Sequence, residues 1–551
     1  MKRPPTTDPI AADKSPVAVG GLPSAVVQKR FSMMSTNPVN VFTNDPNARG
    51  LSLEQVVPPT GAAPFAIPGW TGAGGLFSPG TPEFQAGELY VVLNRTYTMW
   101  ADLFDATFPW KSGAPQLAIA PRAGQSLNAY YDRRGLRFFF DVDKMTGETI
   151  YTCESSDIVA HECGHALLDA QHPDYWDSLF AETVAFHEAF ADISAILTTL
   201  DSPSVRAAIF AENGGDLTRS NVVTRLAEQL ARAFVSNGQA DLVVSADAIR
   251  DVANKFRYRE PDKLPGRTPA NKLSSESHNF SRVFSGAFYD LLVRIYEQLR
   301  QANTALSSDD ALAQARNDVG HLLAHGLILA PRGEAEFKAV ALAMFTVDRQ
   351  LFAGKYFAAL RQAFVGRRIV KAREADAQRM PVVAPRAEAR GMIGIASGAI
   401  VTPAVADLRI GENLPSGYRR ALQVPAREFR LVEKRAQRDA SRVLQFTATR
   451  QVELKGKELG VARGVVVDIA DAVAVHVDGE GRFMAAQARH ADRAREEQVR
   501  DHVAKLVARG RVYEARVGEH TDPMMLIARR QPYYIAYDEQ GNKRIRRAFI
   551  A

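Results

Sequence analysis

The chain has 551 residues, of which 46% are hydrophobic and 24% charged, proportions typical of a globular protein. The length predicts two to four domains, and no uncharged apolar run is long enough to span a bilayer. The net charge of +6 is uneven, because residues 379–551 hold 31 Lys/Arg against 21 Asp/Glu. Acidic residues are interleaved there, so we expect a solvated surface and no nucleic-acid partner, with an unidentified partner of this part as the alternative.

The N-terminal segment has little periodicity. Residues 1–85 are rich in Pro, Gly, Thr and Ala, which predicts an extended arm. The basic start Met1-Lys2-Arg3 has no apolar core after it, so no secretory signal is visible. We therefore expect a cytoplasmic protein, or one exported by a route without a recognisable signal peptide.

Apolar patterning predicts a helix, two strands and a further helix before residue 172. The first helix is expected over 89–104 and the strands over 116–120 and 135–142, with turn residues at 132–135. The second helix, over 156–171, carries the most informative residues of the chain.

That second helix contains His161, Glu162 and His165. Two histidines four residues apart project from one face of a helix and can reach the same metal ion. Neutral imidazoles are good zinc ligands, and bound zinc makes water acidic enough for Glu162 to act as its general base. The alternative is a buried helix whose histidines are satisfied by hydrogen bonds. Cys163 points away from the ligand face, so we interpret it as a small buried hydrophobe.

A third ligand is expected from the next helix, predicted over 178–199. Glu188 would complete a site of two histidines and one glutamate, with an open position for water and one zinc ion per chain. His187 and Glu182 remain alternatives for this ligand.

The two cysteines, Cys153 and Cys163, allow no disulfide framework and fit a reducing compartment.

The remaining chain is first mainly helical and then mixed. Helices are predicted over 222–237, 281–302 and 336–364. The pair His321 and His325 has helical spacing but lacks a glutamate after the first histidine, so we expect core or surface histidines. After two prolines, the pattern predicts strands, a turn, a helix and closing strands, expected at 442–454, 461–477, 478–481, 491–509 and beyond.

Four segments resemble, in order, segments of the thermolysin-like zinc metallopeptidases, the gluzincin group. They are Asn128-Ala129-Tyr130-Tyr131, the stretch from Asp157 to His165, Glu188-Ala189-Phe190-Ala191-Asp192, and Ser277-His278-Asn279-Phe280-Ser281. The resemblance covers roughly residues 86–370. It implies an α+β, two-lobed fold, with a mixed sheet and zinc helix in an N-terminal lobe (86–200) and a helical C-terminal lobe (201–375). The arm (1–85) and a basic α+β accessory domain (385–551) would flank this core.

The resemblance also implies roles for single residues. Asp192 would orient His161, and His278 would stabilise the oxyanion of the reaction, with Tyr175 as a second donor. Asn128 and Ala129 would lie in an edge strand that pairs with a substrate backbone. Ile158 would line an apolar pocket for the residue after the cleaved bond. Arg259, with Arg257 as the alternative, would hold a substrate carbonyl.

The implied function is that of a zinc-dependent endopeptidase that acts on a peptide or protein. Two alternatives stay open: a catalytically idle, zinc-stabilised binding protein, and a translocated effector or toxin protease. Two departures from the family pattern are visible. His187 stands where asparagine is common, and no acidic cluster after Glu188 completes a calcium site with Asp157, so structural calcium is not predicted.

Overall fold

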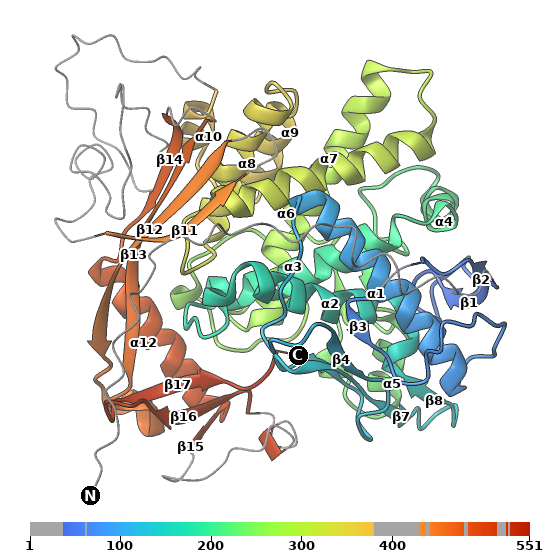
Figure 1. Ribbon diagram of the computed structural model, residues 1–551, viewed down its shortest axis with the longest axis horizontal. Coiled ribbons are helices and arrows are strands. Elements are labelled where there is room, and N and C mark those ends of the chain that lie inside the picture. Colours follow the sequence, from blue (N-terminus) through green and yellow to red (C-terminus); the bar gives the residue numbers. More distant parts are fainter. Residues whose placement is uncertain are drawn as a thin grey trace, which may run out of the picture.

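Two packed helices at the centre of the molecule carry the predicted metal ligands (Figure 1). In this computed structural model they are α2 (Ser156–Gln171) and α3 (Ala181–Thr199), close to the ranges predicted. Gly164 allows their close approach, because a Cβ atom there would lie 2.6 Å from Ser194 Oγ and 2.9 Å from Ala191 Cα. The structure describes residues 37–60, 63–379, 429–436, 441–478, 483–514, 525–526, 529 and 531–550.

A four-stranded mixed sheet packs beside α2. Its order is β3 (Phe65–Ala66), β4 (Leu117–Ala120), β6 (Gly135–Phe138) and β5 (Ala129–Tyr131), so β5 is at the edge. The expected turn joins β5 to β6, and Arg133 adopts a left-handed conformation in it with φ 65°. The strand expected over 135–142 is interrupted at Phe139, and its second half, β7 (Phe140–Val142), pairs with β8 (Thr149–Tyr151) instead.

The segment before this sheet contains three short strands, beginning at Val39. β1 (Val39–Phe42) pairs with β2 (Leu53–Val56), and β3 joins the sheet through β4. Helix α1 (Pro82–Phe104) begins earlier than expected, because the Thr81 hydroxyl accepts a hydrogen bond from Phe84 N at 3.2 Å and caps it. The first 36 residues of the expected arm lie outside the described residues.

Residues 203–379 are mainly helical, as predicted, but two of the predicted helices have different bounds. The helix expected over 222–237 begins only at Glu228, because Asn221 Oδ1 accepts hydrogen bonds from two following backbone N–H groups and forms a turn before β9 (Arg225–Leu226). The helix expected over 336–364 is broken where Ala353 and Gly354 both have positive φ. The helices here are α4 (Pro203–Asn213), α5 (Glu228–Ser236), α6 (Ser277–Ala302), α7 (Ser308–Leu329), α8 (Phe337–Leu351), α9 (Phe357–Gly366) and α10 (Ala372–Ala377).

The C-terminal segment forms a long antiparallel sheet on one side of the molecule (Figure 1). Its order is β11 (Arg430–Ala436), β12 (Arg442–Glu453), β13 (Val466–Val477) and β14 (Phe483–Arg489). Helix α12 (Arg493–Ala508) follows, near its expected range. A second small sheet contains β15 (Val512–Glu514), β16 (Tyr533–Tyr537) and β17 (Lys543–Arg547). Most of the expected turn over 478–481 lies outside the described residues.

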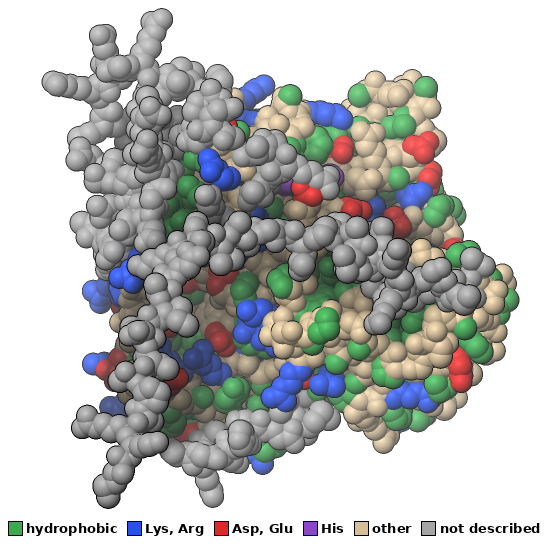
Figure 2. Space-filling view, viewed as in Figure 1, with side chains coloured by type: hydrophobic (Ala, Val, Ile, Leu, Met, Phe, Trp, Pro, Cys, Tyr) green, Lys and Arg blue, Asp and Glu red, His purple; other side chains and the backbone are tan. Residues whose placement is uncertain are grey.

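The expected α+β class is confirmed in its coarse form, because the described chain contains both helices and strands. None of the helices in that part of the chain has the length and apolar character needed to cross a bilayer. In the described part of the face shown in Figure 2, Lys and Arg side chains are scattered among Asp and Glu.

Candidate metal centre

His161, His165 and Glu188 converge from α2 and α3 onto one point. Glu188 Oε2 lies 3.6 Å from His161 Nε2 and 3.8 Å from His165 Nε2, and one ligand atom of each residue lies within 4.8 Å of the others. All three side chains are buried, and among the described residues neither His165 Nε2 nor Glu188 Oε2 has a hydrogen-bond partner. Buried polar atoms without partners are costly, so this donor set fits a cation that would satisfy them.

Glu188 and the two alternative ligands face different surroundings. Glu182 accepts hydrogen bonds from the Tyr258 hydroxyl and, at 2.9 Å, from Phe337 N, so its carboxylate is occupied elsewhere. His187 is fully buried, and its Nδ1 lies 3.2 Å from His165 Nδ1, on the far side of that ring from Nε2. The structure therefore brings Glu188, rather than His187 or Glu182, to the two histidines.

Asp192 contacts His161 on the side away from Glu188. Its Oδ1 lies 3.1 Å from His161 Nδ1 and accepts a hydrogen bond from Arg250 Nη2 at 2.8 Å. Burial alone would raise the pKa of Asp192, but Arg250 and then His161 outweigh it and hold the pKa below its usual range. The carboxylate therefore stays charged, and it can fix the tautomer and orientation of His161.

Arg250 is the basic residue that the sequence analysis missed. It lies in the two-residue strand β10 (Arg250–Asp251), and its side chain is 14% exposed. Arg259 and Arg257, the residues expected to hold a substrate carbonyl, are both exposed. No local pattern distinguishes Arg250 in the sequence, since its partner Asp192 is 58 residues away.

His278 reaches the cluster from the first turn of α6. Its Nε2 lies 3.3 Å from Glu188 Oε2, and its Nδ1 lies 2.9 Å from Glu276 Oε1. Burial would lower the pKa of His278, but the carboxylates of Glu188 and then Glu276 raise it above its usual value. The ring is 29% exposed, so it borders the site on its solvent side.

Glu162 lies between the two histidines on α2 and is 4% exposed. Its Oε2 has no hydrogen-bond partner among the described residues. Burial raises the pKa of Glu162 to about 8, in spite of the opposing effect of His161. A carboxyl group whose pKa is near neutral is well matched to proton transfer, and a cation bound beside it would favour its charged form.

The other predicted site residues have mixed outcomes. Ile158 is buried in the first turn of α2, and Asn128 is half-buried, with its carbonyl accepting a hydrogen bond from Thr152 Oγ1 at 3.1 Å. Tyr175 is fully buried and stacks on His172 with ring centroids 4.7 Å apart, so its hydroxyl is closed to a substrate. Cys163 is buried as expected, and burial raises the pKa of its thiol.

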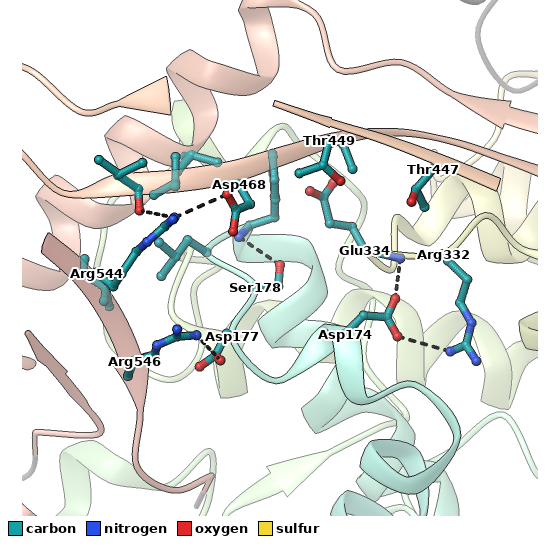
Figure 3. Close-up of a pocket in the computed structure, with 18 of the residues that line it drawn as sticks. Asp174, Asp177, Ser178, Arg332, Glu334, Thr447, Thr449, Asp468, Arg544 and Arg546 are labelled. Carbon is teal, nitrogen blue, oxygen red and sulfur yellow. Dashed lines mark hydrogen bonds and ion pairs between the residues drawn. The ribbon is translucent and has the colours of Figure 1, made fainter. Parts of the chain in front are cut away.

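A cavity of about 770 Å³ lies between the loop after α2 and the C-terminal sheet (Figure 3). None of the three clustered ligands lines it. Its charged side chains are largely paired with one another, with Asp174–Arg332 at 3.1 Å, Asp177–Arg546 at 2.9 Å and Asp468–Arg544 at 3.3 Å. The metal cluster and this cavity are therefore separate features.

Comparison with known proteins gives a structural likeness but no sequence match. No protein-family model matches the sequence, and no curated protein matches it. Among solved structures, the chain is similar to the precursor of protealysin, a metalloproteinase from Serratia proteamaculans, with a TM-score of 0.34 and 14% sequence identity. The match covers 62% of this chain and 90% of that one. A likeness of this size leaves the functional argument to the geometry of the metal cluster.

Proposed function

We propose that the protein is a zinc-dependent peptidase whose metal is held by His161, His165 and Glu188. The observation that carries this proposal is the buried cluster of these three side chains, together with Glu162, whose Oε2 has no hydrogen-bond partner among the described residues. Two imidazole nitrogens and one carboxylate oxygen suit zinc and leave a coordination position open. A site that only stabilised the fold would have four protein ligands and no need of a buried base.

Each side chain around the cluster has its own role in peptide hydrolysis. Zinc, when bound, polarises a water molecule and the carbonyl of the cleaved bond. Glu162 accepts the proton of the attacking water and hands it to the leaving amine. His278, whose Nδ1 lies 2.9 Å from Glu276 Oε1, donates a hydrogen bond from Nε2 to the oxyanion that forms. Asp192 holds His161 in the orientation that directs Nε2 toward the cluster.

The substrate is a peptide that adds to the edge strand β5 beside Ala129. Edge strands present backbone N–H and C=O groups with which an extended peptide can pair. Ile158 offers an apolar surface in the first turn of α2, which favours an apolar residue after the cleaved bond. Arg250, rather than Arg259, is placed to contact a substrate carbonyl, because its guanidinium already lies at Asp192 and His161.

The proposed organisation follows from these roles. The zinc helix and the sheet belong to an N-terminal lobe, the helices from α4 onward form a second lobe, and the C-terminal sheets form an accessory domain. The cleft between the two lobes would contain the metal.

The test is cleavage of a mixture of random peptides by the purified full chain, read by mass spectrometry. We expect about one zinc ion per chain, cleavage that stops when zinc is chelated, and recovery when zinc is restored. Zinc binding without cleavage of any peptide would contradict the proposal and favour an idle, zinc-stabilised binding protein. Failure to bind zinc would contradict both readings.

A further inference from the structure

The outer edge of β5 is already paired with the end of the chain. Tyr131 N donates a hydrogen bond to Ile550 O at 2.9 Å, and Ile550 N donates one to Tyr131 O at 2.9 Å. The bridge is antiparallel. Strand β17 leads back from the C-terminal sheets toward the sheet that contains β4, which brings this segment to β5 (Figure 1). The strand expected to be open to a substrate is therefore closed at one of its ends.

Ala129 and Tyr131 direct their backbone groups to the same side of β5. In an antiparallel pair, successive residues alternate between facing the partner strand and facing away from it. Asp132 N donates to Gly135 O in the hairpin that joins β5 to β6, so the residues at 130 and 132 face β6. Ala129 and Tyr131 face outward, and a peptide paired with Ala129 would lie in line with Ile550.

The closed end of β5 contacts the last turn of the zinc helix through the Tyr131 side chain. The Tyr131 hydroxyl donates a hydrogen bond to Asp169 Oδ2 at 3.0 Å, and Asp169 is one turn past His165 on α2. At the other end of β5, Asn128 O accepts from Thr152, which precedes α2. Strand β5 therefore lies beside the zinc helix, with Tyr131 toward the last turn of α2 and Asn128 toward the segment before it.

The pairing segment is fixed in the fold and is not a loose tail. Ile550 is 4% exposed, and the ring of Phe549 packs on Tyr130 with centroids 5.4 Å apart. Ala548 N donates to Pro532 O at 2.9 Å, and the Trp176 indole donates to Arg547 O at 3.2 Å. A substrate that needed the position opposite Tyr131 would have to displace this buried segment.

We propose that residues 548–550 limit the substrate to peptides with one or two residues before the cleaved bond. A peptide that pairs with β5 as Ile550 does runs antiparallel to the strand, so its own N-terminal side points toward Ile550. Counted from the residue opposite Ala129, which we place directly before the cleaved bond, the second residue lies opposite Tyr130. The next residue meets Ile550. The site therefore removes short N-terminal pieces from peptides and does not cut within long chains.

This inference rests on the proposed peptidase function, and a ladder of peptides tests it on the unaltered full chain. The ladder keeps one cleaved sequence and adds residues singly to its N-terminal side, while a control ladder adds the same residues to the C-terminal side. We expect kcat/KM at the fixed bond to fall by roughly 10- to 100-fold once the N-terminal side exceeds two residues, the cost of displacing a buried aliphatic side chain. The control ladder should show no such fall.

Equal cleavage of every N-terminal length would overturn the inference while leaving the peptidase function intact. No cleavage of even the shortest peptides would instead contradict the peptidase function, and the inference with it. The two failures are therefore distinguishable.

Two variants trace the limit to this segment. A chain without residues 549–551, and Ile550→Pro, which removes the N–H donor to Tyr131, should cleave long and short peptides alike. Ile550→Val keeps the donor and most of the side chain, so it should keep the limit. Zinc content and cleavage of the shortest peptide report whether each variant is folded. If the folded chain without residues 549–551, or folded Ile550→Pro, still cleaved only short peptides, the role given to residues 548–550 would be wrong.

Discussion

At the scale of single residues, His187 contacts the side of the His165 ring opposite the nitrogen that faces the proposed metal. The two Nδ1 atoms lie 3.2 Å apart, so one must carry a hydrogen and the other must accept it. Burial, followed by nearby positive charges, holds the pKa of both rings well below the usual value, so both are neutral. If His165 carries its hydrogen on Nδ1 and donates it to His187, its Nε2 is left free for zinc.

Replacing His187 tests whether this hydrogen bond orients His165. His187→Asn keeps a hydrogen-bond acceptor near His165 and should retain zinc affinity close to that of the natural chain. His187→Leu removes the acceptor, and zinc affinity should fall by ~10- to 100-fold, as is usual for lost partners of metal-ligating histidines. Competition with a chromogenic chelator measures both affinities. Equal affinities in the asparagine and leucine variants would show that His187 does not orient His165.

At the scale of elements, a buried carboxyl group connects the segment after β1 to the start of α2 and to α5. Asp45 Oδ1 accepts hydrogen bonds from Asn47 N and Gln229 N, both at 2.9 Å, and Oδ2 accepts one from Ser155 Oγ at 2.8 Å. Burial, and then the neighbouring Asp157, raise the pKa of Asp45 far above its usual value. The folded protein therefore holds a proton here that the unfolded chain releases near pH 4.

This raised pKa makes stability depend on pH in a stated direction. The contribution of Asp45 is fully present below its unfolded pKa and is lost as pH rises toward its folded pKa, at about 1.4 kcal/mol per pH unit. Asp45→Asn keeps an acceptor for the two backbone N–H groups and cannot ionise. The free energy of unfolding of Asp45→Asn should therefore fall less steeply between pH 5 and pH 7 than that of the natural chain. Urea titrations at each pH measure both. Parallel slopes for the two proteins would contradict this role.

The elements around the metal could be predicted because their signals are local. The histidines, Glu162 and the apolar face of α2 all lie within sixteen consecutive residues. The break between α8 and α9 and the turn before α5 were missed, because left-handed residues such as Ala353 and a single turn-forming Asn221 leave only a weak trace in a helical pattern. Arg250 was missed for another reason. Its role depends on a contact across 58 residues, which no spacing rule shows.

At the scale of the whole molecule, Arg495 of α12 fastens the C-terminal sheets to the rest of the chain. Its guanidinium donates to Glu334 and Glu336, and it lies over the ring of Phe180 at 4.3 Å. The side chains of Arg495 and Glu334 are 11% and 6% exposed, so the pair is shielded from solvent. These contacts join residues some 160 positions apart and hold the C-terminal sheets against the rest of the chain, so the sequence alone could not predict them.

Removing this arginine should destabilise the protein far more than removing an exposed one. Arg495→Ala removes the closest ion-pair partner of the buried Glu334, which keeps Arg489 at 3.5 Å, and it also removes the partner of the half-buried Glu336. The free energy of unfolding should fall by about 3 kcal/mol. Arg493→Ala is the matched control, because Arg493 is on the same helix, is 90% exposed and, within the described residues, pairs with Glu497 of its own helix. Its effect should stay within about 0.5 kcal/mol. Denaturant unfolding measures both, and equal effects would contradict the proposed docking.

The central claim is that Glu162 acts on water at a zinc site, and Glu162→Gln tests it most directly. The control is Glu182→Gln, the same change at a half-buried glutamate that accepts hydrogen bonds from Tyr258 and Phe337. Zinc content and peptide cleavage are measured for the natural chain and both variants. We predict about one zinc ion per chain in all three, with cleavage reduced ~10²- to 10⁴-fold in Glu162→Gln alone. Full cleavage by zinc-loaded Glu162→Gln would contradict the account.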